Sequence, residues 1–289
     1  MVRRERGVKG YFVRRRSSWV FAGAILVVLY FVFARYIDWW LYHAMPHRTE
    51  RKPADVSRRI KSSGLPVQII GKPIYAGREW HIEVVSTSRK AAKRRACIFG
   101  GIHGNEPAGT EAALTLVELL ARNPLVYPSV DFVVVPLVNP WGWAHGLRHN
   151  GNNVDVAHSF VRGNTDEALA VRKLLSRVRC DLIIDLHEDR MRRGTYLVTY
   201  ENPDIAVAHA VMQDIAKKGV SLSGPAPHGV YHIRETEFSS LERPTLSLYA
   251  RSQGTALSYI VETPSTFSLP ERVRVQGLIL ERLIGSLGN

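Results

Sequence analysis

Cysteine is scarce in this chain of 289 residues, which contains only Cys97 and Cys180. Each lies inside or beside an apolar run, so we expect buried free thiols, although a disulfide between them stays open. Two cysteines do not define the redox compartment. Internal repeats and low-complexity tracts are also absent from the sequence. The length suits one large α/β domain with a substantial core, or two small domains.

Net charge is almost absent from most of the chain, although the whole chain carries +13. Residues 1–62 account for +10 of this charge, whereas residues 63–289 carry only +3. A nucleic-acid-binding domain needs a basic face on its folded body. We therefore expect no nucleic acid partner. A basic segment beside the body favours contact with a membrane surface instead.

The N-terminal segment holds a long apolar run. Residues 19–34 contain no charge, but these 16 residues are slightly short of the roughly 20 needed to cross a bilayer. Arg35 could extend the span by snorkelling, and the aromatic residues that follow suit an interfacial belt. A buried core helix is one alternative. A cleaved signal peptide is another, but no small-x-small cleavage site follows the run.

These features predict four segments: a basic cytoplasmic tail (1–17), a transmembrane anchor (18–42), a juxtamembrane linker (43–64) and a folded body (65–289). Seven Lys and Arg precede the apolar run, and four lie between residues 35 and 52. Positive charge accumulates on the cytoplasmic side of a span. We therefore expect a single-pass protein of the inner or plasma membrane, with the lipid bilayer as a partner of residues 18–42 and the body outside the cytoplasm.

The body alternates between short apolar runs and amphipathic stretches. The expected strands are 67–70, 80–85, 96–101, 131–138, 181–186, 195–200, 245–249 and 256–261, and the expected helices are 111–121, 165–178, 203–218 and 270–287. The first two strands suit an antiparallel edge, and Pro136 suggests a bend or an edge position. This alternation predicts an α/β fold with a mixed, mostly parallel central sheet covered by helices on both faces.

Three expected strands run into residues that could hold a metal or move a proton. The strand at 96–101 leads to His103 and Glu106, the strand at 181–186 leads to His187, and the strand at 256–261 leads to Glu262. In open α/β sheets, sites form outside the carboxyl ends of strands, so these residues could converge. Two His and one Glu complete the protein ligands of a catalytic zinc site. Taken singly, each residue also has a purely structural explanation.

Two further groups would complete the chemistry of such a site. Glu262 is not needed as a ligand and can act as a general base on water. Arg148 lies in the long loop 139–155 and always keeps its charge. It could therefore stabilise a developing oxyanion.

With these motifs in place, the chain resembles the zinc carboxypeptidase (carboxypeptidase A-like) family and its small deacylase relatives, the succinylglutamate desuccinylase/aspartoacylase group. The resemblance covers roughly residues 97–284. The matching motifs are His103-Gly-Asn-Glu106, Asn139-Pro-Trp-Gly142, Arg148 seven residues before Asp155, Asp185-Leu-His187, and Glu262 in Val-Glu-Thr-Pro-Ser. The resemblance implies one Zn²⁺ per chain, held by His103, Glu106 and His187, with Glu262 and Arg148 as catalytic residues.

One part of the pattern departs from the family. Where the family has Asp-Leu-Asn-Arg-Asn-Phe, this chain has Asp-Val-Ala-His-Ser-Phe, with Ala157 and His158 in place of the pair that grips a C-terminal carboxylate. A histidine offers at most one donor to a carboxylate, whereas an arginine offers a bidentate fork. The residues expected at the substrate are Asn150, Asp155, His158 and Tyr249. The alternatives are Tyr231 for the tyrosine and Arg190, Arg192 or Arg193 for the carboxylate contact, and Glu188 and Asp189 either orient His187 or face solvent.

The sequence therefore predicts a membrane-anchored, zinc-dependent hydrolase of an amide bond. A metallocarboxypeptidase-like peptidase is the first expectation, with cell-wall peptides as a substrate class if the body lies outside the cytoplasm. A deacylase of N-acyl amino acids is the alternative. A third alternative is a non-catalytic, membrane-tethered binding domain. The change at residues 157 and 158 favours that alternative, and the complete zinc and base set opposes it.

Overall fold

The structure is a computed structural model that describes residues 51–203, 205–233 and 245–287, together with residues 25, 29, 30, 33 and 37. The chain divides into two units, residues 1–45 and 46–289. The predicted tail and anchor lie outside the described residues, apart from these five positions. Among the described residues, every helix is too short or too polar to cross a membrane.

Within the described residues, eight strands form one sheet in the order β1-β4-β6-β5-β7-β10-β8-β9. The strands are β1 (Val67–Gly71), β4 (Ile82–Ser86), β5 (Arg94–Phe99), β6 (Val130–Val135), β7 (Leu182–Asp189), β8 (Tyr196–Tyr200), β9 (Val230–Ile233) and β10 (Leu257–Pro264). A separate two-stranded sheet joins β2 (Ile74–Tyr75) to β3 (Arg78–Glu79). The four central strands, β6, β5, β7 and β10, are parallel to one another. The pairs β1–β4, β4–β6 and β10–β8 are antiparallel, so the predicted mixed, mostly parallel sheet is confirmed.

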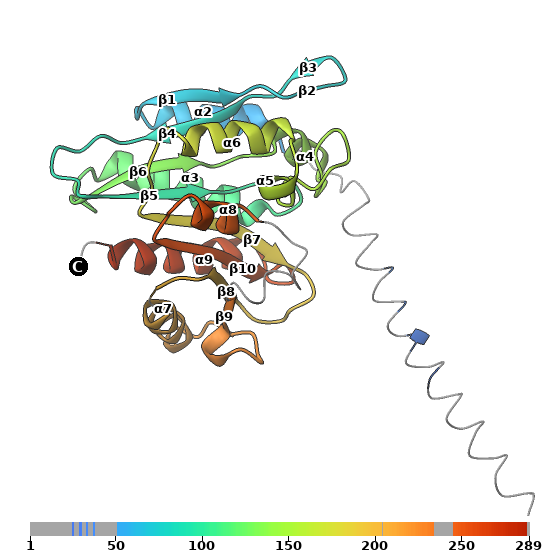
Figure 1. Cartoon of the computed structure of the whole chain (residues 1–289), viewed down its shortest axis with the longest axis vertical. Helices are drawn as coiled ribbons and strands as arrows, with labels where there is room; N and C mark the ends of the chain where they lie inside the picture. The colour runs from blue at the N-terminus through green and yellow to red at the C-terminus, as the bar shows by residue number, and fades with distance from the viewer. Residues whose placement is uncertain are drawn as a thin grey trace, which may run out of the picture. The chain divides into compact units, whose positions relative to one another are not determined.

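Helices cover both faces of this sheet (Figure 1). They are α2 (Pro53–Ser62), α3 (Pro107–Arg122), α4 (Pro140–His145), α5 (Ser159–Arg162), α6 (Asp166–Leu175), α7 (Ala206–Lys217), α8 (Leu246–Ser252), α9 (Leu269–Gly285) and the 3₁₀ turn η1 (Pro227–Gly229). A hydroxyl side chain caps the first turn of several of these helices. Thr165 accepts a hydrogen bond from the Ala168 amide and Ser268 accepts one from the Glu271 amide.

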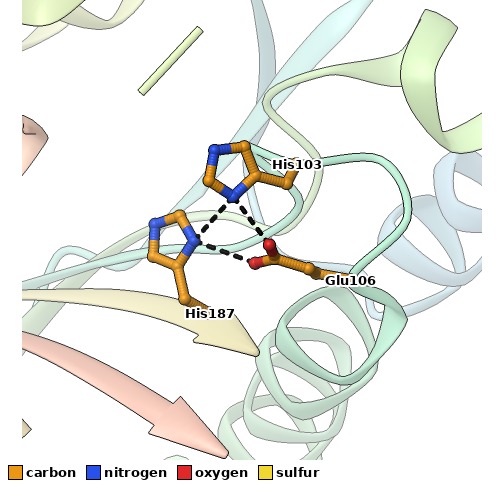
Figure 2. A group of neighbouring side chains, drawn as sticks. All are labelled: His103, Glu106 and His187. Atoms are coloured by element: carbon orange, nitrogen blue, oxygen red, sulfur yellow. Dashed lines mark hydrogen bonds and ion pairs between the residues drawn. The ribbon is translucent and has the colours of Figure 1, made fainter. Parts of the chain in front are cut away.

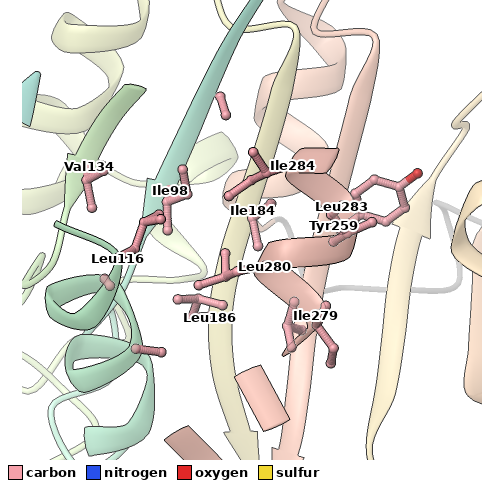
Figure 3. Close-up of a cluster of buried hydrophobic side chains, with 14 of the residues drawn as sticks. Ile98, Leu116, Val134, Ile184, Leu186, Tyr259, Ile279, Leu280, Leu283 and Ile284 are labelled. Carbon is pink, nitrogen blue, oxygen red and sulfur yellow. The ribbon is translucent and has the colours of Figure 1, made fainter. Parts of the chain in front are cut away.

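Alternate residues of the central strands enter two separate cores, as the two-residue period of a strand requires. One core packs the sheet against α2, α3, α7 and α9, and Figure 3 shows Ile98, Ile184 and Tyr259 of the sheet meeting Leu280 and Ile284 of α9. The other core packs intervening residues such as Cys97, Phe99 and Ile183 against α5, α6 and α8. The face of β7 that carries Ile183 therefore points toward α6 and α8. His187, four residues further along the strand, lies on the same face.

Three local predictions were wrong or incomplete. Residues 245–249, expected as a strand, begin helix α8, because the Thr245 hydroxyl caps its first turn by accepting from the Leu248 amide. Strand β6 ends at Val135 and lies inside the sheet, so Pro136 follows the strand and neither bends it nor marks an edge. Strands β7 and β10 continue three residues beyond their expected ends, which makes His187 and Glu262 strand residues.

Part of the predicted linker is helical. Residues 53–62 form α2, whose Val56 and Ile60 side chains are buried in the core beside α3. Arg59 adds ion pairs to Glu111 and Glu118 on α3. These residues therefore belong to the folded body, which begins earlier than residue 65.

The expectation of free thiols was wrong, because Cys97 and Cys180 form a disulfide with a Cα–Cα distance of 5.9 Å. Cys97 lies in β5, and Cys180 lies just before β7, the strand that pairs with β5 in parallel register. Both side chains point into the core beneath α6 and α8. Pairing of the two strands thus brings together two cysteines that are 83 residues apart.

Candidate metal centre

The first two candidate ligands lie in the turn between β5 and α3. His103 occupies the turn, and Glu106 is the N-cap residue of α3, with Pro107 as its first helical residue. The turn packs closely against α4, where a Cβ atom on Gly104 would lie 1.9 Å from the Gly142 carbonyl carbon. Only glycine fits there, so the Gly in His-Gly-Asn-Glu is what lets the turn present His103 and Glu106 together.

The third candidate ligand, His187, comes from the adjacent strand β7 and faces the other two (Figure 2). Its Nδ1 atom lies 3.0 Å from Nδ1 of His103 and 2.9 Å from Oε2 of Glu106. Nδ1 of His103 lies 2.8 Å from the other carboxylate oxygen, Oε1. One ligand atom from each residue lies within 4.8 Å of the others, and all three residues are buried.

This donor set fits Zn²⁺. Two imidazole nitrogens and a carboxylate are the ligands of a catalytic zinc site. Zinc bonds of 2.0–2.1 Å place neighbouring tetrahedral ligands about 3.3 Å apart, close to the separations of His103, Glu106 and His187. Two imidazole nitrogens that face each other at 3.0 Å also need a proton or a cation between them, because their lone pairs otherwise repel.

The outer nitrogen of each histidine lies beside an aspartate carboxylate. Nε2 of His103 lies 3.1 Å from Oδ1 of Asp155, and Nε2 of His187 lies 3.1 Å from Oδ1 of Asp185. The first contact is a hydrogen bond, whereas the second is an ion pair in which the Asp185 carboxylate has no hydrogen bond within the described residues. A carboxylate behind a metal-bound histidine favours the tautomer that leaves the inner nitrogen free to bind the metal.

The electrostatics of the site favour a bound cation. Burial alone would raise the pKa of Glu106, yet His103 and His187 beside it hold that pKa well below its usual range. Burial alone would lower the pKa of His187, but Asp185 and Glu106 raise it well above its ordinary value. Buried carboxylates thus stabilise positive charge at this point in the fold.

Arg148 lies at the same centre. Its Nη1 atom donates to Oε1 of Glu106 at 3.1 Å, and its Nε atom donates to Oδ2 of Asp155 at 2.9 Å. Burial disfavours the charge, but Asp155 and Glu106 raise the pKa of Arg148 above its ordinary value. A fixed positive charge therefore lies beside the candidate ligand Glu106.

Glu262 lies on β10 directly opposite His187 on β7. Paired residues of parallel strands point to the same face, and neighbouring strands are about 4.8 Å apart. Its Oε2 atom is buried without a hydrogen bond in the described part of the chain. Burial raises the pKa of Glu262, as do Glu106 and Asp189, while His187 and Arg148 oppose the rise. A carboxyl group with a raised pKa beside a metal site suits proton transfer near neutral pH.

Helix α9 supports the His187 side of the centre from beneath. Nε2 of Gln276 donates to the His187 carbonyl at 2.9 Å and to the Thr263 hydroxyl at 3.0 Å. The Glu188 carboxylate pairs with Arg272 and accepts a hydrogen bond from the Ala108 amide at 2.6 Å. Burial raises the pKa of Glu188 to about 7, against the opposing effect of Arg272. Glu188 therefore faces the protein interior, where it connects β7, α3 and α9.

The four residues expected at the substrate lie in different surroundings. Asp155 holds His103 and Arg148, and its Oδ1 atom also accepts from the Ala157 amide. His158 comes just before α5, with Nδ1 3.9 Å from Asp155 and 44 % of its side chain exposed. Asn150 is buried, and its Nδ2 atom donates to Oε2 of Glu167. Tyr249 lies on α8, partly buried against the second core.

The alternative carboxylate contact, Arg192, already has several partners. Its guanidinium lies 4.6 Å above the ring of Tyr231 and donates to the Gly224 carbonyl at 3.1 Å. Its Nε atom is 3.8 Å from Asp189. Arg192 and Tyr231 are therefore parts of one packed cluster on the surface of β8 and β9.

The sequence indicated no role for Gln276 or Glu167, and it marked Asp185 only as part of the motif Asp185-Leu-His187. Asp185 could have been identified from the two-residue period of β7, which places it on the same face as His187. Gln276 is a polar residue on the apolar side of α9, a position that indicates a buried hydrogen bond. Glu167 gave no such signal, because its partners are remote in the sequence.

Comparisons with known proteins lead to carboxypeptidases and to a family without an assigned function. Residues 65–204 match a family described as "Protein of unknown function (DUF2817)". Carboxypeptidase 2 of Trichophyton tonsurans is 27% identical over 122 residues, which are 39% of this chain and 23% of that protein. The chain thus spans about a fifth of the length of the curated relatives that it matches.

Solved structures show the same fold. A metallo-carboxypeptidase from Burkholderia cenocepacia is 20% identical, with a TM-score of 0.66 over 85% of this chain and 70% of that one. A metallo-carboxypeptidase from Pseudomonas aeruginosa, in complex with (2-guanidinoethylmercapto)succinic acid, is 16% identical, with a TM-score of 0.66 and the same coverage. By its motifs, by these relatives and by its fold, the chain fits the zinc carboxypeptidase-like family.

Proposed function

We propose that this chain is a zinc-dependent hydrolase of an amide bond, and specifically a peptidase of the metallocarboxypeptidase type. The observation that carries the proposal is the convergence of His103, Glu106 and His187, with Glu262 opposite His187 on the next strand. The resemblance to metallo-carboxypeptidases supports it. One Zn²⁺ per chain agrees with the one set of three ligands found among the residues that the structure describes.

Each residue of the centre has a role in this reaction. Zn²⁺ supplies Lewis-acid chemistry to an amide carbonyl and to water. Glu262 takes a proton from the attacking water and returns it to the leaving amine, which its raised pKa permits. Arg148 keeps its charge and donates hydrogen bonds to the oxyanion that develops on the carbonyl oxygen.

The second candidate function is deacylation of a small N-acyl amino acid. The departure at Ala157 and His158 keeps this candidate open, because the arginine with which the family binds the C-terminal carboxylate of a peptide is missing and a partly exposed histidine takes its place. An N-acyl amino acid also carries a free carboxylate, so a histidine with a single donor would be a weak contact for either substrate.

A substrate panel tests these alternatives. The full chain, loaded with zinc, is assayed against peptides with free C-termini, the same peptides with amidated C-termini, and N-acyl amino acids. Release of C-terminal residues from the free peptides alone supports the peptidase. Cleavage of the N-acyl amino acids alone contradicts it and supports the deacylase. Stoichiometric zinc without turnover of any of these substrates favours the non-catalytic binding domain.

The membrane anchor and the placement of the body outside the cytoplasm are also proposed. The uncharged run at 19–34 supports the anchor, and its described members Ile25, Leu29, Tyr30 and Phe33 are exposed. The Cys97–Cys180 disulfide supports an oxidising compartment. Cell-wall peptides would then be available as substrates. Reporter fusions at residues 17 and 289 test the topology, and a cytoplasmic C-terminal reporter would exclude that substrate class.

A further inference from the structure

A buried carboxylate lies behind the loop that carries Arg148. Glu167 is the second residue of α6 and has no exposed surface. Its Oε1 atom accepts from the Tyr75 hydroxyl at 2.6 Å, and its Oε2 atom accepts from Nδ2 of Asn150 at 3.1 Å. Burial raises the pKa of Glu167, against the effect of these two donors. A charge so placed is unfavourable for folding unless it is hydrogen-bonded, and the Tyr75 hydroxyl and the Asn150 amide supply these bonds.

Asn150 is the centre of the loop between Arg148 and Asp155. Its Oδ1 atom accepts from the amides of Asn152 at 3.1 Å and Val154 at 3.0 Å. The backbone N–H of Asn150 donates to the Val154 carbonyl at 3.0 Å. Every polar group of the Asn150 side chain is therefore used, and its Nδ2 atom connects the loop to Glu167 on α6.

Tyr75 fixes the same loop by packing as well as by its hydroxyl. A Cβ atom on Gly151 would lie 2.2 Å from Cγ of Tyr75, so the ring rests directly on the loop backbone. Tyr75 comes from β2, outside the main sheet, and is buried. The loop is thus held between β2 and the start of α6.

The two ends of this loop reach the metal centre. Arg148 contacts Glu106, Asp155 contacts His103, and the two loop residues are joined to each other at 2.9 Å. We propose, on the basis of the function proposed above, that Glu167 is a positioning residue that acts through Asn150. It sets where Arg148 and Asp155 meet the metal ligands, and Tyr75 assists it.

The chemistry of this contact predicts which substitutions preserve it. A glutamine at residue 167 can accept from Asn150 with its carbonyl oxygen and donate to the Tyr75 hydroxyl, which can accept. A leucine can do neither, and it leaves the Asn150 amide and the Tyr75 hydroxyl buried without partners. Glu167→Gln should therefore retain the loop, and Glu167→Leu should release it.

The experiment compares these two variants of the full chain with wild type. For Glu167→Leu we expect kcat to fall on the order of 10–100-fold with a much smaller change in KM, because a catalytic group misplaced by about 1 Å can lose 10²-fold. Zinc affinity, measured by competition with a chelator, should weaken up to about 10-fold through His103 and Asp155. Hydrogen exchange should accelerate in peptides covering residues 148–155. Glu167→Gln should stay near wild type in all three measurements.

Val171→Ala is the matched control, because Val171 is equally buried on the same helix and belongs to the second core. It should lower the melting temperature without changing zinc affinity or the exchange of residues 148–155. The proposal is overturned if Glu167→Leu leaves zinc affinity and the hydrogen exchange of residues 148–155 at wild-type values. It is also overturned if Val171→Ala changes these two quantities as Glu167→Leu does. These two measurements need no substrate, so they decide the role of Glu167 even if the proposed hydrolysis is wrong.

Discussion

Each histidine of the metal centre has an aspartate beside its outer nitrogen, but the two are supported in different ways. His187 and Asp185 lie on one strand, two residues apart, and Gln276 of α9 holds the strand from beneath. His103 lies in a turn, and its partner Asp155 comes from a loop 52 residues further on. We refer to these as the strand half and the loop half of the centre.

The difference between the halves is one of distance in sequence and of rigidity. A strand in the middle of a sheet fixes His187 and Asp185 relative to each other without help from other segments. The loop half depends on contacts that must form between α4, α6, β2 and the loop itself. Sites on regular elements hold geometry better than sites on loops, so we expect the two halves to respond differently to substitution.

The largest expected effects concern turnover, where each half supplies one catalytic residue. Glu262→Gln on the strand half should lower kcat by about 10²–10⁴-fold, because the proton acceptor is lost. Arg148→Met on the loop half should lower kcat by about 10²–10³-fold, because the oxyanion loses its charged donor. Steady-state kinetics with measured zinc content tests both. Glu262→Gln should keep its zinc, and loss of the metal would mean that Glu262 is a ligand.

The disulfide joins the strands that lead to the two halves, so its removal tests whether it holds them in register. Cys97→Ala with Cys180→Ala should lower the free energy of unfolding by about 2–4 kcal/mol, chiefly because the unfolded chain gains freedom. Zinc affinity should not change, since the sheet itself sets the register of β5 and β7. Denaturant unfolding and chelator competition measure the two quantities. Weaker zinc binding in the double variant would show that the bridge, and not the sheet, aligns the halves.

A pair of matched substitutions separates the halves most directly. Asp155→Asn and Asp185→Asn should each weaken zinc binding about 10–100-fold, as expected for the partner behind a metal-bound histidine. Only Asp155→Asn also disturbs Arg148, so it should lower kcat at saturating zinc while Asp185→Asn should not. Zinc titration followed by kinetics on the loaded variants distinguishes them. An equal loss of kcat in both would contradict the assignment of Arg148 to the loop half.

The sequence indicated the strand half more fully than the loop half. His187 and Glu262 follow apolar runs, and their meeting follows from the rule that parallel strands end at one edge of the sheet. The mostly parallel sheet was predictable because short apolar runs alternate with amphipathic stretches along the chain. Asp185 could be placed by strand periodicity alone. These inferences use only local patterns, which a single sequence displays.

Contacts between distant segments were not predictable. The Cys97–Cys180 bridge depends on which strands are neighbours and on their register, and apolar runs do not encode either. The contact of Tyr75 with Glu167 spans 92 residues. Helix α8 was missed because its first residues, Thr-Leu-Ser-Leu-Tyr, alternate as a strand does, and the Thr245 cap decides the outcome. Helix α2 was missed because its apolar face is only Val56 and Ile60.

The smallest expected effect concerns α2, which packs against α3 and α4 next to the loop half. Arg59→Ala removes ion pairs of 2.6 Å to Glu111 and 2.8 Å to Glu118, but these side chains are about one-third exposed. Exposed pairs contribute about 0–1 kcal/mol, so the free energy of unfolding should change by no more than that. Ile60→Ala is the control, because burial of this side chain should contribute about 2–5 kcal/mol. Denaturant unfolding measures both variants. If Ile60→Ala proved as mild as Arg59→Ala, residues 53–62 would behave as the linker that the sequence predicted, and the loop half would not depend on α2.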